Sequence, residues 1–302
     1  MTSMLERPVD LDGMRRGATG DSPAKRRLSR RSILGGIARH SLLIALLIVF
    51  LAPLFFIVTT ALMTDQQALT SNLIPDPINW ANFAEVFDRI PLVRYVANTV
   101  LIAVATTVFA IVSSVPVAYA LATFKFKGRR ALWIAIIAAM MLPPQVTIVP
   151  LYVMWAQVGA VGTPLPLIVP ALFGDAFTIF LLRQFFVSVP RSYIDAARID
   201  GAGEFRILWS VFMPMVRPAI VAAGLFAFFF AWNDFFNPLL YLGSNQEWYT
   251  LSIGLSQFRS VYAVQWNLAM AATLLFVLPV VVLFFFAQKQ FVQGIALTGV
   301  KE

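Results

Sequence analysis

The chain has 302 residues, of which 59% are hydrophobic and 13% charged, and its mean hydropathy is +0.78. These values lie far outside the range of soluble domains, so we expect the lipid bilayer to be its solvent. The sequence has no cysteine and one histidine, His40, which stands beside a basic cluster. Disulfides, thiol nucleophiles and cysteine-ligated metals are therefore excluded, and we expect no catalytic or metal site.

Six runs are apolar and long enough to cross a hydrocarbon core, which needs about 20 residues of helix. Because the runs are continuous, they favour helices over the short alternating strands of a barrel. We therefore predict an all-α, polytopic membrane protein with six transmembrane helices. The runs are 41–63, 95–122, 131–156, 163–182, 219–242 and 266–287.

Prolines interrupt three of these runs, and each removes a backbone donor. Broken helices are tolerated at membrane depth where protein or a water-filled cavity satisfies the freed carbonyls, so the pattern favours a transport path over a simple anchor. The fourth run also contains Asp175, which we expect to face protein or water. The prolines are Pro143, Pro144, Pro164, Pro166, Pro170 and Pro238.

The net charge of +8 follows the topology and does not predict a nucleic-acid partner. Twenty of the 23 Lys and Arg residues fall on one side if the N-terminus is cytoplasmic, as the positive-inside rule requires. We expect both termini in the cytoplasm. The domains would be a disordered basic tail at 1–40, a membrane domain at 41–290 and a cytoplasmic tail at 291–302.

After the first run, Asn79 is a candidate N-cap for a short amphipathic helix with Trp80, Phe83, Ala84 and Phe87 on one face.

The segment 189–214, between the fourth and fifth runs, predicts two helices on the cytoplasmic face. Ser192 and Asp195 form an Asp version of a capping box, followed by Tyr193, Ala196 and Ala197 on one face. Asp200-Gly201 predicts the end of this helix.

A second helix is expected at 204–213, with its large apolar residues on one side, and it should close at Pro214. Small residues on an exposed helix let another backbone approach, as a helix-in-groove partner needs. The alternative is an interfacial helix pair resting on lipid. The apolar residues are Phe205, Leu208, Trp209 and Phe212.

This loop resembles the signature of bacterial ABC-importer permeases, which is Glu-Ala-Ala, three residues, Gly, nine residues and Ile-x-Leu-Pro. Here Asp195-Ala196-Ala197 is followed at the same spacing by Gly201 and by Val-Phe-Met-Pro214. The segments 118–128, 142–152, 180–186 and 231–235 resemble the carbohydrate-uptake, maltose-permease-type branch.

The resemblance implies a complex in the bacterial cytoplasmic membrane. Its other members would be a second, different permease, two copies of an ATPase subunit and an extracytoplasmic sugar-binding protein. ATP and Mg would bind the partner ATPase, because this chain lacks a Gly-rich loop followed by Lys-Ser/Thr. We therefore expect no cofactor on this chain. We also expect the chain to be a transport subunit and not an enzyme. The expected ATPase-coupling residues are Asp195, Ala196, Ala197, Asp200, Gly201 and Pro214.

A candidate substrate path lies in the fifth run, where Trp232, Asn233 and Asp234 interrupt an aromatic stretch and Asn237 follows one turn later. Helical spacing would place both Asn amides on one face. Amides and aromatic rings suit a sugar, but the same Asn side chains could instead hydrogen-bond to a partner permease.

Two other function classes compete with the importer. An ion-gradient-driven secondary transporter would show internal repeats and ionisable relays within the membrane, whereas only Asp175 and Asp234 lie within the runs. A membrane enzyme would need catalytic His, Cys or paired carboxylates, which the sequence does not show.

Overall fold

The structure, a computed structural model, describes residues 30–243, 245–258 and 265–299. The regular elements in these ranges are all helical, so the all-α class is confirmed. The chain divides into two compact units, Met1–Leu54 and Phe55–Glu302. Helix α1 (Arg30–Ala61) fills the described part of the first unit, and its last turns belong to the second. The predicted basic tail lies outside the described residues up to position 29.

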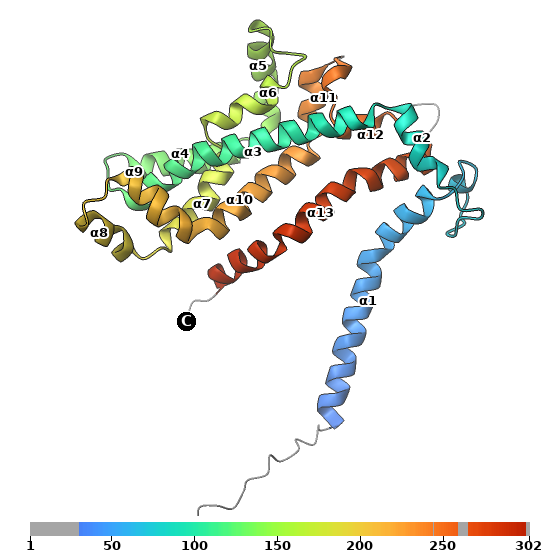
Figure 1. Cartoon of the computed structure of the whole chain (residues 1–302), viewed down its shortest axis with the longest axis horizontal. Helices are drawn as coiled ribbons and strands as arrows, with labels where there is room; N and C mark the ends of the chain where they lie inside the picture. Colours follow the sequence, from blue (N-terminus) through green and yellow to red (C-terminus); the bar gives the residue numbers. More distant parts are fainter. Residues whose placement is uncertain (1–29, 244, 259–264, 300–302) are drawn as a thin grey trace, which may run out of the picture. The chain divides into compact units, whose positions relative to one another are not determined.

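The second unit is built from long helices joined by short helical turns (Figure 1). Its elements are η2 (Gln67–Leu69), α2 (Ala81–Arg89), α3 (Leu92–Thr123), α4 (Arg129–Met141), α5 (Pro144–Gln157), α6 (Leu165–Ile168), η3 (Val169–Phe173), α7 (Ala176–Val187), α8 (Arg191–Ile199), α9 (Glu204–Arg206), η4 (Ile207–Phe212), α10 (Met213–Asn233), α11 (Phe236–Leu242), η5 (Gln246–Trp248), α12 (Leu251–Ser256) and α13 (Trp266–Gly299).

Within the described residues, five helical stretches are long and apolar enough to cross a membrane, or six if one bent pair counts as a single span. A multi-pass protein is therefore supported. The five stretches overlap the first, second, fourth, fifth and sixth predicted runs. They are Arg39–Ala61, Leu92–Thr123, Leu165–Val187, Glu204–Asn233 and Trp266–Phe286.

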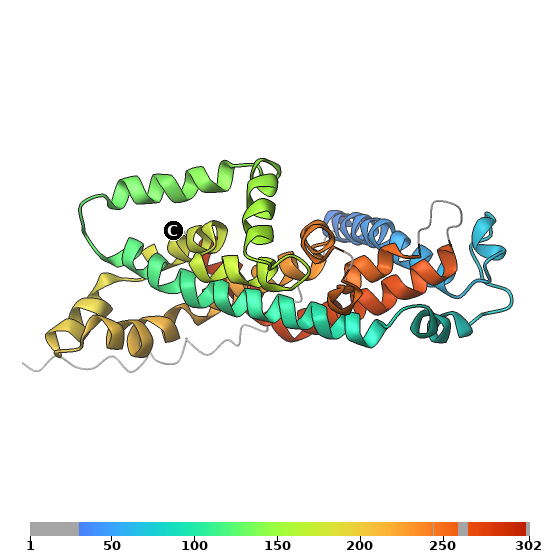
Figure 2. The same cartoon turned by 90° about the horizontal axis from the view of Figure 1, so that it is seen from above.

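The third predicted run is not one continuous helix. It consists of α4 and α5, which meet at an angle of 93° (Figure 2). Leu142, held before a proline, adopts an extended backbone with ψ of 120°, because the proline ring disfavours the helical region for the residue that precedes it. Pro144 then occupies the first turn of α5, where its missing N–H costs no hydrogen bond.

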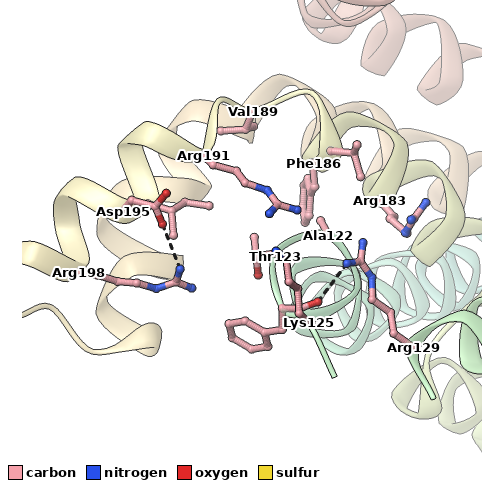
Figure 3. Close-up of a pocket in the computed structure, with 13 residues that line it drawn as sticks. Ala122, Thr123, Lys125, Arg129, Arg183, Phe186, Val189, Arg191, Asp195 and Arg198 are labelled. Carbon is pink, nitrogen blue, oxygen red and sulfur yellow. Dashed lines mark hydrogen bonds and ion pairs between the residues drawn. The ribbon is translucent and has the colours of Figure 1, made fainter. Parts of the chain in front are cut away.

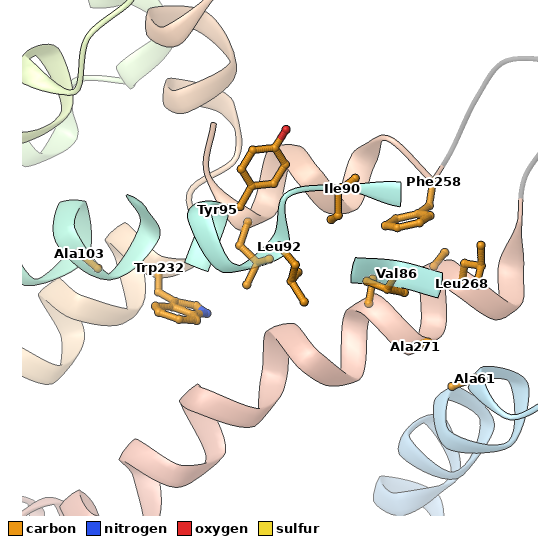
Figure 4. Packing of buried hydrophobic residues seen from close by; sticks show 13 residues of the cluster. Ala61, Val86, Ile90, Leu92, Tyr95, Ala103, Trp232, Phe258, Leu268 and Ala271 are labelled. Carbon is orange, nitrogen blue, oxygen red and sulfur yellow. The ribbon is translucent and has the colours of Figure 1, made fainter. Parts of the chain in front are cut away.

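Helix α3 is the centre of the second unit and packs against α7, η3 and α10. Two buried clusters lie along it. One surrounds Tyr95 and Trp232 and includes residues of α2, α12 and α13 (Figure 4). The other surrounds Tyr119 and Phe212 and includes α7 and α8. The second cluster joins the long helices to the segment 189–214, between the fourth and fifth predicted runs.

The short helix expected after the first run is present as α2. Its N-cap is Trp80, so the predicted N-cap Asn79 was wrong by one residue, although the Oδ1 of Asn79 accepts from the N–H of Ala81 at 3.2 Å. Its buried positions are Asn82 and Val86, whereas Trp80 is exposed. Of the predicted apolar face, Trp80, Ala84 and Phe87 are exposed, which agrees with an amphipathic helix at the surface, and Phe83 is partly buried. The polar Asn82 is buried because its Nδ2 donates to the carbonyls of Ala61 and Met63 at 2.8 and 2.7 Å.

Candidate functional site

The signature loop begins with α8, whose start differs from the prediction. Pro190 is the N-cap, and the side chains make no capping hydrogen bond there. The capping box of Ser192 and Asp195 was therefore wrong, because the N-cap lies two residues earlier than predicted and Asp195 is in the interior of the helix. The Oδ1 of Asp195 instead accepts from the Nη1 of Arg198 at 3.3 Å.

The end of α8 confirms the predicted Asp200-Gly201 stop. Gly201 has a φ of +80°, which L side chains rarely adopt. Its N–H donates to the carbonyl of Arg198, and the N–H of Ala202 donates to the carbonyl of Ala197, both at 3.0 Å. These are the two hydrogen bonds of a Schellman motif, and they fix the direction in which the chain leaves the helix.

Burial divides the residues of α8 into an anchor and an open side. Ile194 is buried in the cluster of Phe186 and Phe212, whereas Asp195 and Ala196 are exposed. Ala197 is half-buried against the same cluster. The expected shared face of small residues is therefore open at Ala196 and partly covered at Ala197.

The second predicted helix continues into the membrane and does not stop at Pro214. Residues 204–206 are α-helical, 207–212 form a π-helical turn, and α10 follows directly. A π turn is one of the local adjustments that let a helix continue past a proline. The four large apolar residues were predicted on one side of this helix, and that prediction was wrong. Leu208 and Phe212 are buried, but Phe205 and Trp209 are 76% and 54% exposed, because the wider π turn changes the angle between successive side chains.

A polar network joins this loop to α3. The Nε of Arg198 donates to Oε1 of Glu204 at 2.7 Å, and the hydroxyl of Tyr119 donates to Oε2 of Glu204 at 3.0 Å. The hydrogen bond to Glu204 raises the pKa of Arg198 above its ordinary value. The ring of Tyr119 packs edge-on against Phe212, 5.0 Å between centroids. Glu204 therefore contacts both the end of α8 and a buried residue of the second span.

The predicted path residues do not share one helix face. Helix α10 ends at Asn233, Asp234 is extended with ψ of 123°, and α11 begins at Phe236. The Nδ2 of Asn233 donates back to the carbonyl of Phe229 at 2.8 Å. Asn237 donates from its backbone N–H and its Nδ2 to the carboxylate of Asp234, at 3.2 and 2.8 Å. The carboxylate stabilises the start of α11, and this break separates the two amides.

Asn233 nevertheless lines a cavity of about 390 Å³ between α10, α12 and α13. Three hydroxyl-bearing residues share the lining with it, together with Phe235 and Phe276; they are Ser252, Ser256 and Thr273. Trp232 is 1% exposed and its Nε1 has no hydrogen-bond partner in the described part of the chain. Trp232 therefore packs in the core and does not line the cavity. Of the predicted path residues, Asn233 lines it.

The carboxylate of Asp175 faces protein, as predicted. It is the N-cap of α7 and accepts from the N–H of Thr178 at 2.7 Å. Among the described residues, no group of three or more His, Asp and Glu side chains is arranged to hold a metal ion.

With this geometry established, comparisons with known proteins decide the family. The model of the family "binding-protein-dependent transport system inner membrane component" matches residues 114–297. The chain belongs to this family. It is a transport subunit rather than an enzyme, and it is an inner-membrane, multi-pass component. The matched region includes α8, the π turn and the cavity at Asn233.

Relatives of this transport component are permeases of solute importers. The chain is 30% identical to an arabinooligosaccharides transport system permease protein of Halalkalibacterium halodurans, over 78% of this chain and 84% of the relative. It is 31% identical to an sn-glycerol-3-phosphate transport system permease protein of Yersinia pestis, over 85% and 94%. These relationships support the ABC-importer interpretation over an ion-gradient-driven transporter.

The fold of this transport component also occurs in a solved bacterial ABC transporter involved in the import of the acidic polysaccharide alginate. The TM-score is 0.75, with 23% identity over 86% of this chain and 98% of the other. This likeness establishes the fold.

The sequence interpretation did not include Tyr119, Arg198 and Glu204 as site residues. A signal was present, since Glu204 and Arg198 have opposite charges on either side of the glycine stop. Tyr119 could not be found this way, because it lies 85 residues from Glu204 and only the packing of α3 brings the two together.

Proposed function

We propose that this permease forms the membrane path for a sugar or an oligosaccharide delivered by an extracytoplasmic binding protein. A second, different permease would complete the path. Two ATPase subunits would bind ATP and Mg, and their ATP hydrolysis would drive transport. The names of the relatives support a solute of this class, since one transports arabinooligosaccharides and another a polyol phosphate.

The observation that carries the proposal is the construction of α8. Ile194 anchors the helix in a buried cluster, while Asp195 and Ala196 remain exposed. Ile199, at the end of the helix, is 87% exposed. A short anchored helix with a small residue, a carboxylate and an open apolar side chain is suited to enter a groove of a partner protein.

In this proposal α8 is the coupling helix, and the loop lies in the cytoplasm with both termini. The distribution of Lys and Arg supports this orientation. Asp200 and Gly201 would set the exit direction of α8. Pro214 would lie within the continuous helix that connects the docked loop to the membrane span.

The substrate path is proposed at the cavity beside Asn233. The Asn233 amide keeps one N–H and its oxygen for sugar hydroxyls, since its other N–H donates to the carbonyl of Phe229. The three neighbouring hydroxyls donate to backbone carbonyls, so they can accept from a sugar. Phe235 and Phe276 supply the apolar faces on which sugar rings pack. Asp234 and Asn237 would act indirectly, because their mutual hydrogen bonds hold the break that ends α10.

The experiment compares the intact complex, reconstituted in liposomes, with variants of α8. Ala196→Trp should abolish substrate-stimulated ATPase activity while the permease stays inserted, because a large ring cannot enter a groove shaped for alanine. The matched control is Ala84→Trp, on the exposed side of α2 beside other aromatic residues, which should leave the activity unchanged. Normal stimulation in Ala196→Trp would contradict the docking role.

A second measurement tests the energy source. Uptake of arabinooligosaccharides and related sugars into liposomes should require internal ATP and should persist when a protonophore collapses the ion gradient. Uptake that persists without ATP and stops with the protonophore would contradict the proposal.

A further inference from the structure

Beside the coupling loop lies a cavity of about 630 Å³ whose wall is strongly basic (Figure 3). It is lined by residues of the α3–α4 connection, α7 and α8. The guanidinium groups of Arg191 and Arg198 point into it from α8, and those of Arg129 and Arg183 lie on the opposite side (Figure 3). Its basic residues are Lys125, Arg129, Arg183, Arg191 and Arg198.

The cavity wall contains too few anions to balance these charges. Asp195 is the one carboxylate among the lining residues, and it is already paired with Arg198. Arg198 is also paired with Glu204. In the described part of the chain, Arg129, Arg183 and Arg191 have no ion pair. Like charges so close together repel one another, so an anion in the cavity would stabilise it.

Arg183 is held in place by an aromatic stack and not by an acceptor. Its guanidinium carbon lies 4.0 Å from the centre of the Trp133 ring, and Trp133 in turn stacks on Phe180 at 5.7 Å and 9°. The buried Nε of Arg183 has no hydrogen-bond partner among the described residues. A stacked guanidinium with an unused donor is positioned to receive a phosphate group.

A second, largely apolar cavity continues from the first along α4. It shares Lys125, Arg129 and Arg183 with the basic cavity. It adds Arg130 and an apolar wall that includes Trp133 and Ile134. Ile134 is 55% exposed. The two cavities together therefore combine a cationic end with an apolar side, which fits an amphipathic anion and not a small free one.

The position along the helices indicates which amphipathic anion this is. Helix α3 ends at Thr123, α4 begins at Arg129 and α7 ends at Val187, so the cavity lies where three membrane helices terminate. This is the level of lipid headgroups, where basic side chains attract anionic lipid. We propose that the cavity binds an anionic phospholipid, with its phosphate between Arg129, Arg183 and Arg191 and an acyl chain along Ile134.

The test uses the intact transport complex purified in mild detergent. The probes are phosphatidylglycerol, phosphatidylcholine with the same chains, and inorganic phosphate, and native mass spectrometry measures the lipid retained. We expect retention of phosphatidylglycerol over phosphatidylcholine. Arg129→Gln and Arg183→Gln should each reduce this preference about fivefold, and Arg183→Lys should reduce it less, since the charge remains. Arg94→Gln, which removes an exposed charge at the other end of α3, should leave it unchanged.

Further arms separate the lipid from other occupants. Ile134→Gln should weaken phosphatidylglycerol binding, whereas a site for free phosphate would be unaffected. The proposal is overturned if inorganic phosphate displaces the lipid at equal concentration, or if both glutamine variants keep the full preference. It is also overturned if these variants retain the lipid and instead lose the ATPase subunit, because the cavity would then hold the partner protein. If Arg183→Gln fails to assemble, Arg129→Gln provides the same comparison.

Discussion

Arg198 and Glu204 face each other across the glycine turn that ends α8, with Nε 2.7 Å from Oε1 and a separation of six positions in the sequence. Tyr119 contacts the other oxygen of the same carboxylate at 3.0 Å. Through this one carboxylate, the proposed coupling helix, the continuous helix that follows it and the second span are held together. The arrangement predicts separable effects on stability and on coupling.

Glu204→Gln should lower substrate-stimulated ATPase activity of the reconstituted complex with little change in stability. Both partners of the ion pair are partly exposed, and such pairs contribute less than about 1 kcal/mol. Glu85→Gln is the control, because it breaks a comparable Arg–Glu pair on α2 far from the loop. Equal ATPase stimulation in the two variants would show that the Glu204 network has no role in coupling.

Gly201→Val should impair coupling because a β-branched residue at a φ of +80° is strained by about 1 kcal/mol or more. Gly203→Val is the matched control, since Gly203 has an extended backbone with φ of −69° and open space around its Cα. The measurement is substrate-stimulated ATPase activity of complexes with confirmed membrane insertion. If both variants behave alike, the left-handed turn does not position α8.

Gly254→Ala should destabilise the membrane domain. The added Cβ would lie 2.5 Å from Cδ2 of the buried Tyr95 ring, and such overpacking costs about 1–3 kcal/mol. Gly224→Ala is the control, because its nearest contact is Thr107 at 3.7 Å. Thermal unfolding in detergent should show a lower midpoint for Gly254→Ala alone, and Tyr95→Leu in the same chain should restore part of the loss.

Asn233→Ala and Asn237→Ala should differ, because the two amides have different surroundings. Asn233 lines the cavity, so its loss should reduce or alter sugar uptake while the complex stays intact. Asn237 holds Asp234, so its loss should loosen the start of α11 and lower the unfolding midpoint. Loss of the partner permease in either variant would favour a role in assembly. Parental uptake of every sugar tested by both variants would place the path elsewhere.

The sequence was most informative where a local rule acts alone. Long apolar runs predicted the membrane helices, and the Asp200-Gly201 pair predicted the end of α8, because each depends on neighbouring residues only. The double proline predicted a break after Leu142, but its 93° angle depends on how α4 and α5 pack. The π turn at 207–212 was not predictable, since Ile207 and Phe212 are drawn into one buried cluster by residues of α3 and α7.

The candidate path shows the same limit. Periodicity placed Asn233 and Asn237 on one face because it assumed a continuous helix. Asp234 accepts hydrogen bonds from Asn237 and ends that helix, which a count of residue spacing does not reveal. The hydroxyls that accompany Asn233 come from α12 and α13, so only the fold brings them to the amide.

The passage of the chain through Pro214 without interruption has a mechanical consequence. Residues from Glu204 to Asn233 form one helical stretch of 30 residues, which spans about 45 Å at 1.5 Å per residue. Its first residue follows the glycine turn after α8, and its last residue, Asn233, lines the cavity. If such a rod pivots near one end, a tilt of about 5° displaces its other end by about 4 Å over that length. A small angular change at the loop would thus be enough to change the width of a passage for a sugar ring.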